Sequence, residues 1–451
     1  MSAYAETLAA AVVRRDGPAT AKLLRLDESA HPGGWAFVQQ SVLAKMRERK
    51  SADDFARASE AEAQAVGLGE FSALCGLHLA TVGSLAAAHE CDAGPARREK
   101  LDTAFRLHSQ AFKKFLELFR KDGSSWLVET MMTLIHDTRS LAVWADSETS
   151  ETHTEHLRET KSLLETCFRQ TTMGRAMTDD AQRKRMVGLY IVNHQFKVFF
   201  ALKSLQLCRN LVRSVEMPTF PNLEDFPLNQ QVMYEYYRGR LLILDDRVTD
   251  ARRALQFALD NCPPQCRRNR RLILEYLVPI SLFCGRAPSQ KLLDEYQIGY
   301  LSDLMRHVRN GNVRALSALI DDQQDHFIAR GLFLALDQLK VIAYRNLFRN
   351  VVALYQAQAE ERQKTRVPLD LFLRPFELYR EPDPLAQLTD AGSADAGGDA
   401  KSELMEHVKC VLSNLIYERF VKGYMSHEKE MLVLSPKEPF PKLSVVNPIE
   451  G

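Results

Sequence analysis

The sequence carries almost no net charge. Its 59 Lys and Arg residues are offset by 58 Asp and Glu residues, which leaves a formal charge of +1 over 451 residues. A polycation that coats nucleic acid by charge alone is therefore excluded. Any binding of nucleic acid has to come from a local basic patch.

Long apolar runs are also missing. Stretches such as residues 198–202 and 277–284 stay far below the roughly 18 apolar residues that a membrane-spanning helix needs. Near the start, Glu6 precedes the apolar stretch and Arg14 and Arg15 follow it, which is the reverse of a signal peptide. The 8 cysteines are scattered along the chain, which favours reduced thiols over a disulfide framework. We therefore expect no membrane insertion.

Recognisable catalytic motifs are absent. The sequence has no Walker loop, dinucleotide glycine fingerprint, nucleophile elbow or His-Glu-x-x-His helix. A zinc site can be assembled on paper from four side chains, Cys75, His78, His89 and Cys91. Three of them lie on one apolar helical stripe, and their spacing matches no common ligand pattern. We predict neither an enzyme nor a metal or cofactor site.

What the sequence does contain is helical periodicity. Apolar residues are 45% of the chain, enough for a substantial core. From the start to about residue 215 they recur at steps of three and four, as between Phe71 and His89, and short polar or Gly/Pro clusters separate the segments. We expect residues 1–215 to form an N-terminal domain of helical repeats.

A proline-rich connector precedes a second helical region. Residues 216–227 contain three prolines, which cannot continue a helix. The residues after it have the spacing of a tetratricopeptide-type helical hairpin, with the set Gly239, Ala251, Leu255, Ala258 and Pro263. The small residues allow two antiparallel helices to approach, leucine fills the gap, and proline ends the second helix. We expect residues 228–365 to form a repeat region of this kind.

The C-terminal part changes character. An apolar helical stripe, Leu404 to Leu415, is followed by two short strand patterns at residues 420–426 and 431–435. Helix, helix and terminal hairpin is the order of a winged helix, which we place at residues 366–441. It contains a flexible acidic insert, residues 381–399, and is followed by an extended tail, residues 442–451. The predicted fold is all-α: a TPR-like right-handed helical solenoid that ends in a winged-helix module with a small β-hairpin.

Basic residues on the predicted winged helix are candidate phosphate contacts. They are Lys401, Lys409, Arg419, Lys422 and Lys429. The segment 401–451 holds as many acidic as basic residues, so we expect it to bind nucleic acid only weakly on its own. We expect a partner chain to add positive charge.

Two further groups are candidate partner contacts. Arg267, Arg268, Arg270 and Arg271 directly precede an apolar helix, where they form either a solvated loop or a contact with an anion or an acidic chain. Met431 and Val433 lie on the predicted hairpin, whose edge can pair with another subunit.

Several segments carry a family resemblance. Residues 236–240 (YYRGR) and 269–279 (NRRLILEYLVP) resemble the helical part of a PCI domain. Residues 410–427 (CVLSNLIYERFVKGYMSH), followed by 432–435 (LVLS) and 439–441 (PFP), are similar to the PCI domain-containing protein 2 family. The resemblance covers about residues 185–441.

This resemblance implies a non-enzymatic scaffold in the nuclear-pore-associated transcription and export complex 2, where it serves mRNA export. Its implied partners are a large PCI scaffold subunit of the Sac/germinal-centre-associated type and the small acidic DSS/Sem protein. The winged helices of the two larger subunits would jointly bind RNA or DNA. The implied location is the nucleus, at the pore, with the cytoplasm as an addition. Two alternatives stay open: a subunit of a signalosome- or proteasome-lid-like assembly, and an autonomous nucleic-acid-binding protein.

Overall fold

The computed structural model describes residues 2–26, 35–150, 152–172, 178–360, 363–379 and 397–446. Their secondary structure consists of helices joined by short loops, together with one small sheet. The predicted all-α class is therefore confirmed. The chain divides into two compact units, Met1–Tyr234 and Glu235–Gly451. The division lies inside helix α12, just beyond the proline-rich connector.

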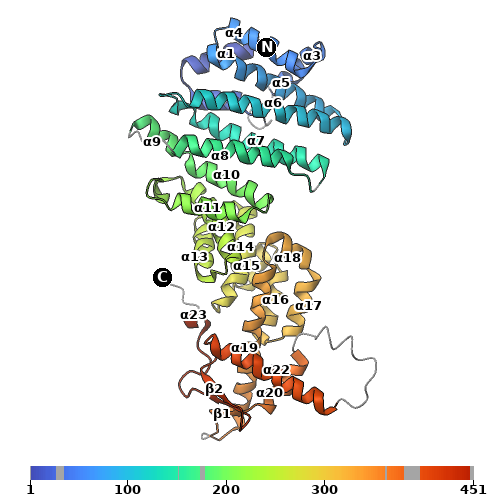
Figure 1. Cartoon of the computed structure of the whole chain (residues 1–451), viewed down its shortest axis with the longest axis vertical. Helices are drawn as coiled ribbons and strands as arrows, with labels where there is room; N and C mark the ends of the chain where they lie inside the picture. The colour runs from blue at the N-terminus through green and yellow to red at the C-terminus, as the bar shows by residue number, and fades with distance from the viewer. Residues whose placement is uncertain are drawn as a thin grey trace. The chain divides into compact units, whose positions relative to one another are not determined.

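Unit 1 consists of successive helices, and its long helices lie layered one against the next from α5 to α8 (Figure 1). The α-helices are α1 Ser2–Val13, α2 Gly17–Leu23, α3 Trp35–Arg47, α4 Ala52–Ala65, α5 Ser72–Glu90, α6 Pro95–Phe119, α7 Val128–Thr149, α8 Glu155–Thr172, α9 Asp179–Arg185, α10 Gly188–Ala201 and α11 Leu205–Val215. Short 3-10 turns are η2 Gly69–Phe71, η3 Ser125–Leu127 and η4 Leu223–Asp225.

Helix α5 forms the centre of the first layers of unit 1. It packs against α3, α4 and α6, and Gly76 allows α4 to approach closely, because a Cβ there would lie 2.4 Å from the Ala56 carbonyl oxygen. The stretch Gly69–Glu90 is long and apolar enough to cross a membrane by length and composition. Since 78% of its apolar window is buried among the neighbouring helices, it has the properties of a core helix.

Unit 2 begins within α12 and contains the remaining helices and the sheet (Figure 1). The helices are α12 Leu228–Leu244, α13 Val248–Asp260, α14 Arg267–Phe283, α15 Gln290–Glu295, α16 Tyr300–Asn310, α17 Val313–Asp322, α18 Gln324–Arg330, α19 Phe333–Gln358, α20 Asp370–Tyr379, α22 Gly397–Tyr417 and α23 Leu443–Val446. The strands are β1 Arg366–Pro368, β2 Gly423–Ser426 and β3 Met431–Leu434.

The residues of the predicted hairpin motif meet between α12 and α13. Ala251, Leu255 and Ala258 of α13 are completely buried. A Cβ at Gly239 of α12 would lie 2.6 Å from Leu255 Cγ, so only glycine fits this position without movement of the leucine. Helix α13 ends at Asp260, ahead of the exposed Pro263.

The sheet has the strand order β1-β3-β2, with both pairs antiparallel. Strands β2 and β3 are the predicted hairpin, whereas β1 was not predicted. Val367, Leu432 and Leu434 are buried, and β1 contacts α20 while β2 contacts α22. The sheet therefore closes one end of a helical core, as in a winged helix.

Two features of the C-terminal region differ from the expectation. Residues 443–446 form the short helix α23, where an extended tail was predicted. Of the predicted insert, residues 397–399 belong to α22, and residues 381–396 lie outside the described residues.

The contact of Gly239 with Leu255 can be tested by adding bulk. We expect Gly239→Val to lower the free energy of unfolding by about 1–3 kcal/mol, because the new side chain has to displace a buried leucine. Asn229→Val is the control, because it introduces the same β-branched residue at an exposed position of the same helix. It should change the free energy of unfolding by less than about 0.5 kcal/mol. Denaturant titration of the two variants provides the measurement, and equal stability would contradict the proposed packing.

Candidate partner and nucleic-acid surfaces

The predicted basic residues of the winged helix do not form one cluster. Lys401 is exposed on the first half of α22, and Arg419 is exposed just beyond its C-terminus. Lys422 precedes β2 and Lys429 lies in the turn that follows it, so these two lie at opposite ends of the strand.

Two of these basic side chains are already paired with carboxylates. Lys409 Nζ lies 2.7 Å from Glu406 Oε1, and this hydrogen bond raises the pKa of Lys409. Lys422 Nζ lies 3.3 Å from Glu438 Oε2. The winged helix thus offers a dispersed and partly neutralised set of positive charges, which agrees with the weak face expected from its composition.

The edge of β3 is not available to a partner. Residue Val433 pairs with Arg366 of β1 on one side and with Tyr424 of β2 on the other, so β3 is the central strand. The prediction that Met431 and Val433 lie on a free edge is wrong, because β1 was missed. Their half-buried side chains lie on the outer face of the sheet beside Tyr424, which is 63% exposed.

Arg270 stabilises the fold of unit 2 directly. Its Nη1 donates to the carbonyl oxygens of Leu259 (3.0 Å) and Cys262 (2.6 Å), at the C-terminal end of α13. Its Nε donates to the Tyr296 hydroxyl at 2.8 Å. A guanidinium in this position satisfies carbonyls that a helix end leaves unpaired and complements the negative end of the helix dipole.

The three neighbouring arginines differ in their contacts. Arg267 donates to the Glu295 carbonyl at 2.8 Å, and Arg271 Nε lies 3.3 Å from Glu275 Oε1. Arg268 is exposed. Carbonyl oxygens and the buried Glu275 carboxylate therefore occupy three of the four arginines inside the fold. The partner contact stays a prediction, and Arg268 is the member best placed for it.

A larger basic site lies elsewhere in unit 2. A cleft of about 950 Å³ opens between the end of α14, helices α16 and α19, and the C-terminal segment that includes Phe440 and Leu443. Six basic residues line it: Arg286, Arg306, Arg309, Arg345, Arg349 and Lys442. None of its lining residues is acidic.

Arg345 forms the buried base of this cleft. It is 3% exposed, its Nη2 donates to the Pro441 carbonyl at 2.6 Å, and its Nη1 donates to Asn346 Oδ1 at 3.0 Å. Its buried Nε has no hydrogen-bond partner among the described residues. Burial, together with the charge of Arg349, lowers the pKa of Arg345 to about 10, so the side chain stays positive at neutral pH.

The charge of the cleft is only partly compensated. Arg306 pairs with Asp303. Within the described part of the chain, Arg286, Arg309, Arg349 and Lys442 form no ion pair. Four uncompensated cations beside a buried fifth create a positive potential that favours a polyanion.

Sequence reasoning missed this cleft because its residues are dispersed between positions 286 and 442. Two pairs of arginines could have indicated it: Arg306 with Arg309, and Arg345 with Arg349. Spacings of three and four residues place both charges of a pair on the same face of a helix. Which helices face one another is a tertiary property.

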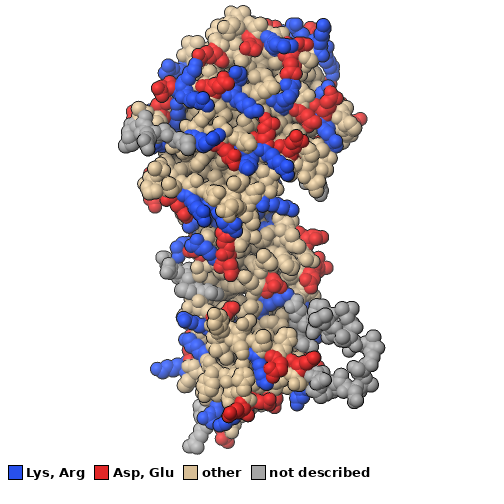
Figure 2. Space-filling view, viewed as in Figure 1, with Lys and Arg blue, Asp and Glu red and all other residues tan. Residues whose placement is uncertain are grey.

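Outside the cleft, the charged surface of unit 1 is mixed. Figure 2 shows basic and acidic side chains interspersed over its visible face. Arg106 makes a two-point contact with Asp53 at 2.7 and 2.8 Å, and Lys113 lies 3.1 Å from Glu159. Such paired charges on the surface add little potential.

Only two of the four residues of the zinc set considered in the sequence belong to the core of unit 1, since His89 is exposed and Cys91 is half-buried. Cys75 and His78 are buried on α5, and burial raises the pKa of the Cys75 thiol to about 12. A thiol that stays protonated is a poor zinc ligand. A different group, at the junction of α7 and α8, brings imidazoles and a carboxylate together.

Stacked helices that end in a helical core closed by a small antiparallel sheet are the architecture of PCI-type proteins. No protein-family model matches the chain. The curated relatives include a PCI domain-containing protein 2 homolog of Dictyostelium discoideum, 31% identical over 75% of this chain and 74% of the relative.

Two other relatives give a similar match. PCI domain-containing protein 2 of Danio rerio is 31% identical over 76% of this chain and 80% of its own length. The Protein CSN12 homolog of Mycosarcoma maydis is 29% identical, over 78% of each chain. The chain belongs to the PCI domain-containing protein 2 family, which confirms the resemblance inferred from its sequence.

Two neighbouring arginines, the buried-contact residue Arg270 and the exposed Arg268, can be compared by replacing each with alanine. We expect Arg270→Ala to lower the free energy of unfolding by about 2 kcal/mol or more, because it leaves two helix-end carbonyls and a tyrosine hydroxyl without their donor. Arg268→Ala should change it by less than about 0.5 kcal/mol. Denaturant titration checks both values, and a destabilised Arg268→Ala variant would contradict the assignment.

Proposed function

We propose that this protein is a non-enzymatic scaffold subunit of an mRNA-export complex and contributes a polyanion-binding cleft to it. The observation that carries the proposal is the cleft of unit 2, with six basic and no acidic lining residues. The family relationship supports a scaffold role, since the relatives are PCI-domain proteins.

The chemistry of the cleft favours a chain of negative charges over a single anion. Four unpaired cations lie on α16, on α19, in the loop after α14 and in the C-terminal segment, so each can meet a separate phosphate or carboxylate. Contacts of this kind provide affinity without sequence specificity. RNA and an acidic small subunit share this chemistry, and the cleft suits either.

The remaining partners follow from the same proposal. A large PCI-type subunit of the Sac/germinal-centre-associated type would pack near the winged helix, where Tyr424 and the outer sheet face are exposed, and extend the basic surface. The acidic partner would be a small DSS/Sem protein. The proposed location is the nucleus, at the pore, with the cytoplasm as an addition.

A signalosome-type assembly is the second candidate. The observation that favours it is the similarity to the Protein CSN12 homolog of Mycosarcoma maydis. In that case the winged helix would serve oligomerisation alone.

Affinity purification of the full-length chain distinguishes the two assemblies. We expect a large PCI-type export subunit and a small acidic protein to co-purify in near-stoichiometric amounts, because a scaffold subunit is held by extended surfaces. Identification of the partners by mass spectrometry is the measurement. Recovery of signalosome or proteasome-lid subunits without export subunits would reject the proposal.

Charge reversal in the cleft tests its role in RNA binding. We expect Arg309→Glu combined with Arg349→Glu to weaken RNA binding by the reconstituted complex about tenfold or more, and to reduce the slope of log K against log salt by about 1.4, or 0.7 for each lost phosphate contact. Fluorescence anisotropy over a salt series gives both quantities.

The matched control is Arg49→Glu combined with Arg213→Glu. Both residues are exposed outside the cleft, so the net charge changes equally while the cleft stays intact. Equal losses in the two double variants would show that only net charge matters. Tight, salt-sensitive RNA binding by the isolated chain would contradict the need for a partner.

A further inference from the structure

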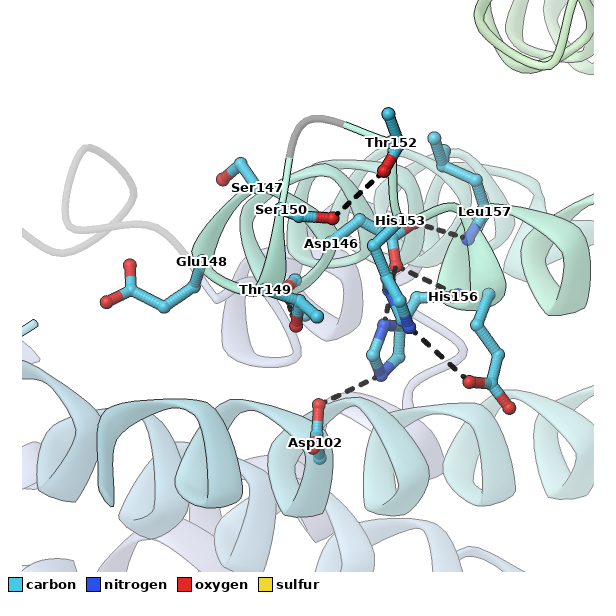
Figure 3. Close-up of polar contacts among 12 residues, drawn as sticks. Asp102, Asp146, Ser147, Glu148, Thr149, Ser150, Thr152, His153, His156 and Leu157 are labelled. Carbon is cyan, nitrogen blue, oxygen red and sulfur yellow. Dashed lines mark hydrogen bonds and ion pairs between the residues drawn. The ribbon is translucent and has the colours of Figure 1, made fainter. Parts of the chain in front are cut away.

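An imidazole–carboxylate cluster lies where α7 meets α8 in unit 1 (Figure 3). Asp146 belongs to the last turn of α7, His153 to the connecting loop and His156 to the first turn of α8. Both rings point toward the same carboxylate oxygen: Asp146 Oδ1 is 3.0 Å from His153 Nδ1 and 2.8 Å from His156 Nδ1. One ligand atom from each residue lies within 4.8 Å of the other two.

The backbone fixes the central carboxylate. Asp146 Oδ1 accepts the His156 N–H at 3.1 Å, and Oδ2 accepts the Leu157 N–H at 3.0 Å. These donors belong to the first turn of α8, which has no intrahelical acceptors for them. The Asp146 side chain is therefore rigid and only 5% exposed, which is how a preorganised ligand is held.

A second carboxylate faces the far side of each imidazole. His156 Nε2 is 3.2 Å from Asp102 Oδ1 on α6, and His153 Nε2 is 3.6 Å from Glu155 Oε2. The His156 ring also packs edge-on against the Phe105 ring, with 4.7 Å between the two ring centroids. Each imidazole thus directs Nδ1 toward Asp146 Oδ1 and Nε2 toward a second carboxylate. Histidines that bind zinc in proteins have the same arrangement, in which the outer carboxylate fixes the tautomer of the ring.

The geometry points to a site for a divalent transition metal of the zinc class, with three protein ligands: Asp146 Oδ1, His153 Nδ1 and His156 Nδ1. Each imidazole binds through its Nδ1 lone pair, and any proton on that atom passes to solvent. The His156 Nε2–H then donates to Asp102, whereas Glu155 lies 3.6 Å from His153 Nε2 as a nearby negative charge. Water takes the fourth position on the side of His153, which is 29% exposed.

Two of the three separations between ligand atoms need little change to accept the ion, and the third, between the two histidine nitrogens, has to reach the same value from within 4.8 Å. Tetrahedral bonds of about 2.0–2.1 Å require ligand atoms about 3.3 Å apart, so the present separations of 2.8 and 3.0 Å widen by a few tenths of an ångström. Two nitrogens and one oxygen favour zinc over magnesium or calcium, which prefer oxygen ligands alone. The bound ion would tie the connecting loop to both helices.

Zinc titration of the untagged full-length chain tests the site. We expect saturable binding of one Zn²⁺ in isothermal titration calorimetry and a higher midpoint of thermal unfolding with the metal. The variant His153→Asn should weaken this binding at least about tenfold. It removes the most exposed ligand of the three and leaves the Asp146 contacts with α8 in place.

His136→Asn is the matched control, because His136 Nδ1 lies 3.1 Å from Asp137 Oδ1 as a single imidazole–carboxylate pair outside the cluster. We expect it to bind Zn²⁺ like the unmodified chain. Asp102→Asn, which keeps all three ligands, should weaken binding about 10- to 100-fold. Absence of a saturable one-to-one event, or equal affinity in His153→Asn, would overturn the proposal and assign any binding to cysteine or to the surface.

Discussion

Close approach of neighbouring helices is the constraint on which both units depend. Each helix buries an apolar stripe against the next, and the backbones come near enough only where side chains are small. Gly76 lies against the Ala56 carbonyl in unit 1, and Gly239 lies against Leu255 in unit 2. These close contacts fix how α4 lies against α5 and how α12 lies against α13.

Stacked helices place their ends and connecting loops at the surface, and the candidate sites lie there. The basic cleft forms where α14 and α16 end beside α19 and the C-terminal segment. The Asp146 cluster forms where α7 ends and α8 begins. At the cluster, first-turn N–H groups of α8 hold the Asp146 carboxylate, and at the cleft, basic side chains from several elements come together.

The helical class and the winged-helix order could be predicted because they depend on local periodicity. The stripe from Phe71 to His89 lies on one helix, η2–α5, and the predicted hairpin corresponds to β2 and β3. Strand β1 could not be predicted, since three residues carry no periodicity and its identity as a strand depends on pairing with β3. That missed pairing also reversed the role expected for Met431 and Val433.

The sequence by itself determined the all-α class, the proline-rich break and the family, because periodicity, proline positions and dispersed family residues are properties of the chain order. Only the tertiary structure decided which charges act together. Arg270 lies against the end of α13, whereas the cleft gathers arginines from segments that are far apart in sequence. The physical reason is that charge interactions depend on distance in space, and helix packing sets that distance.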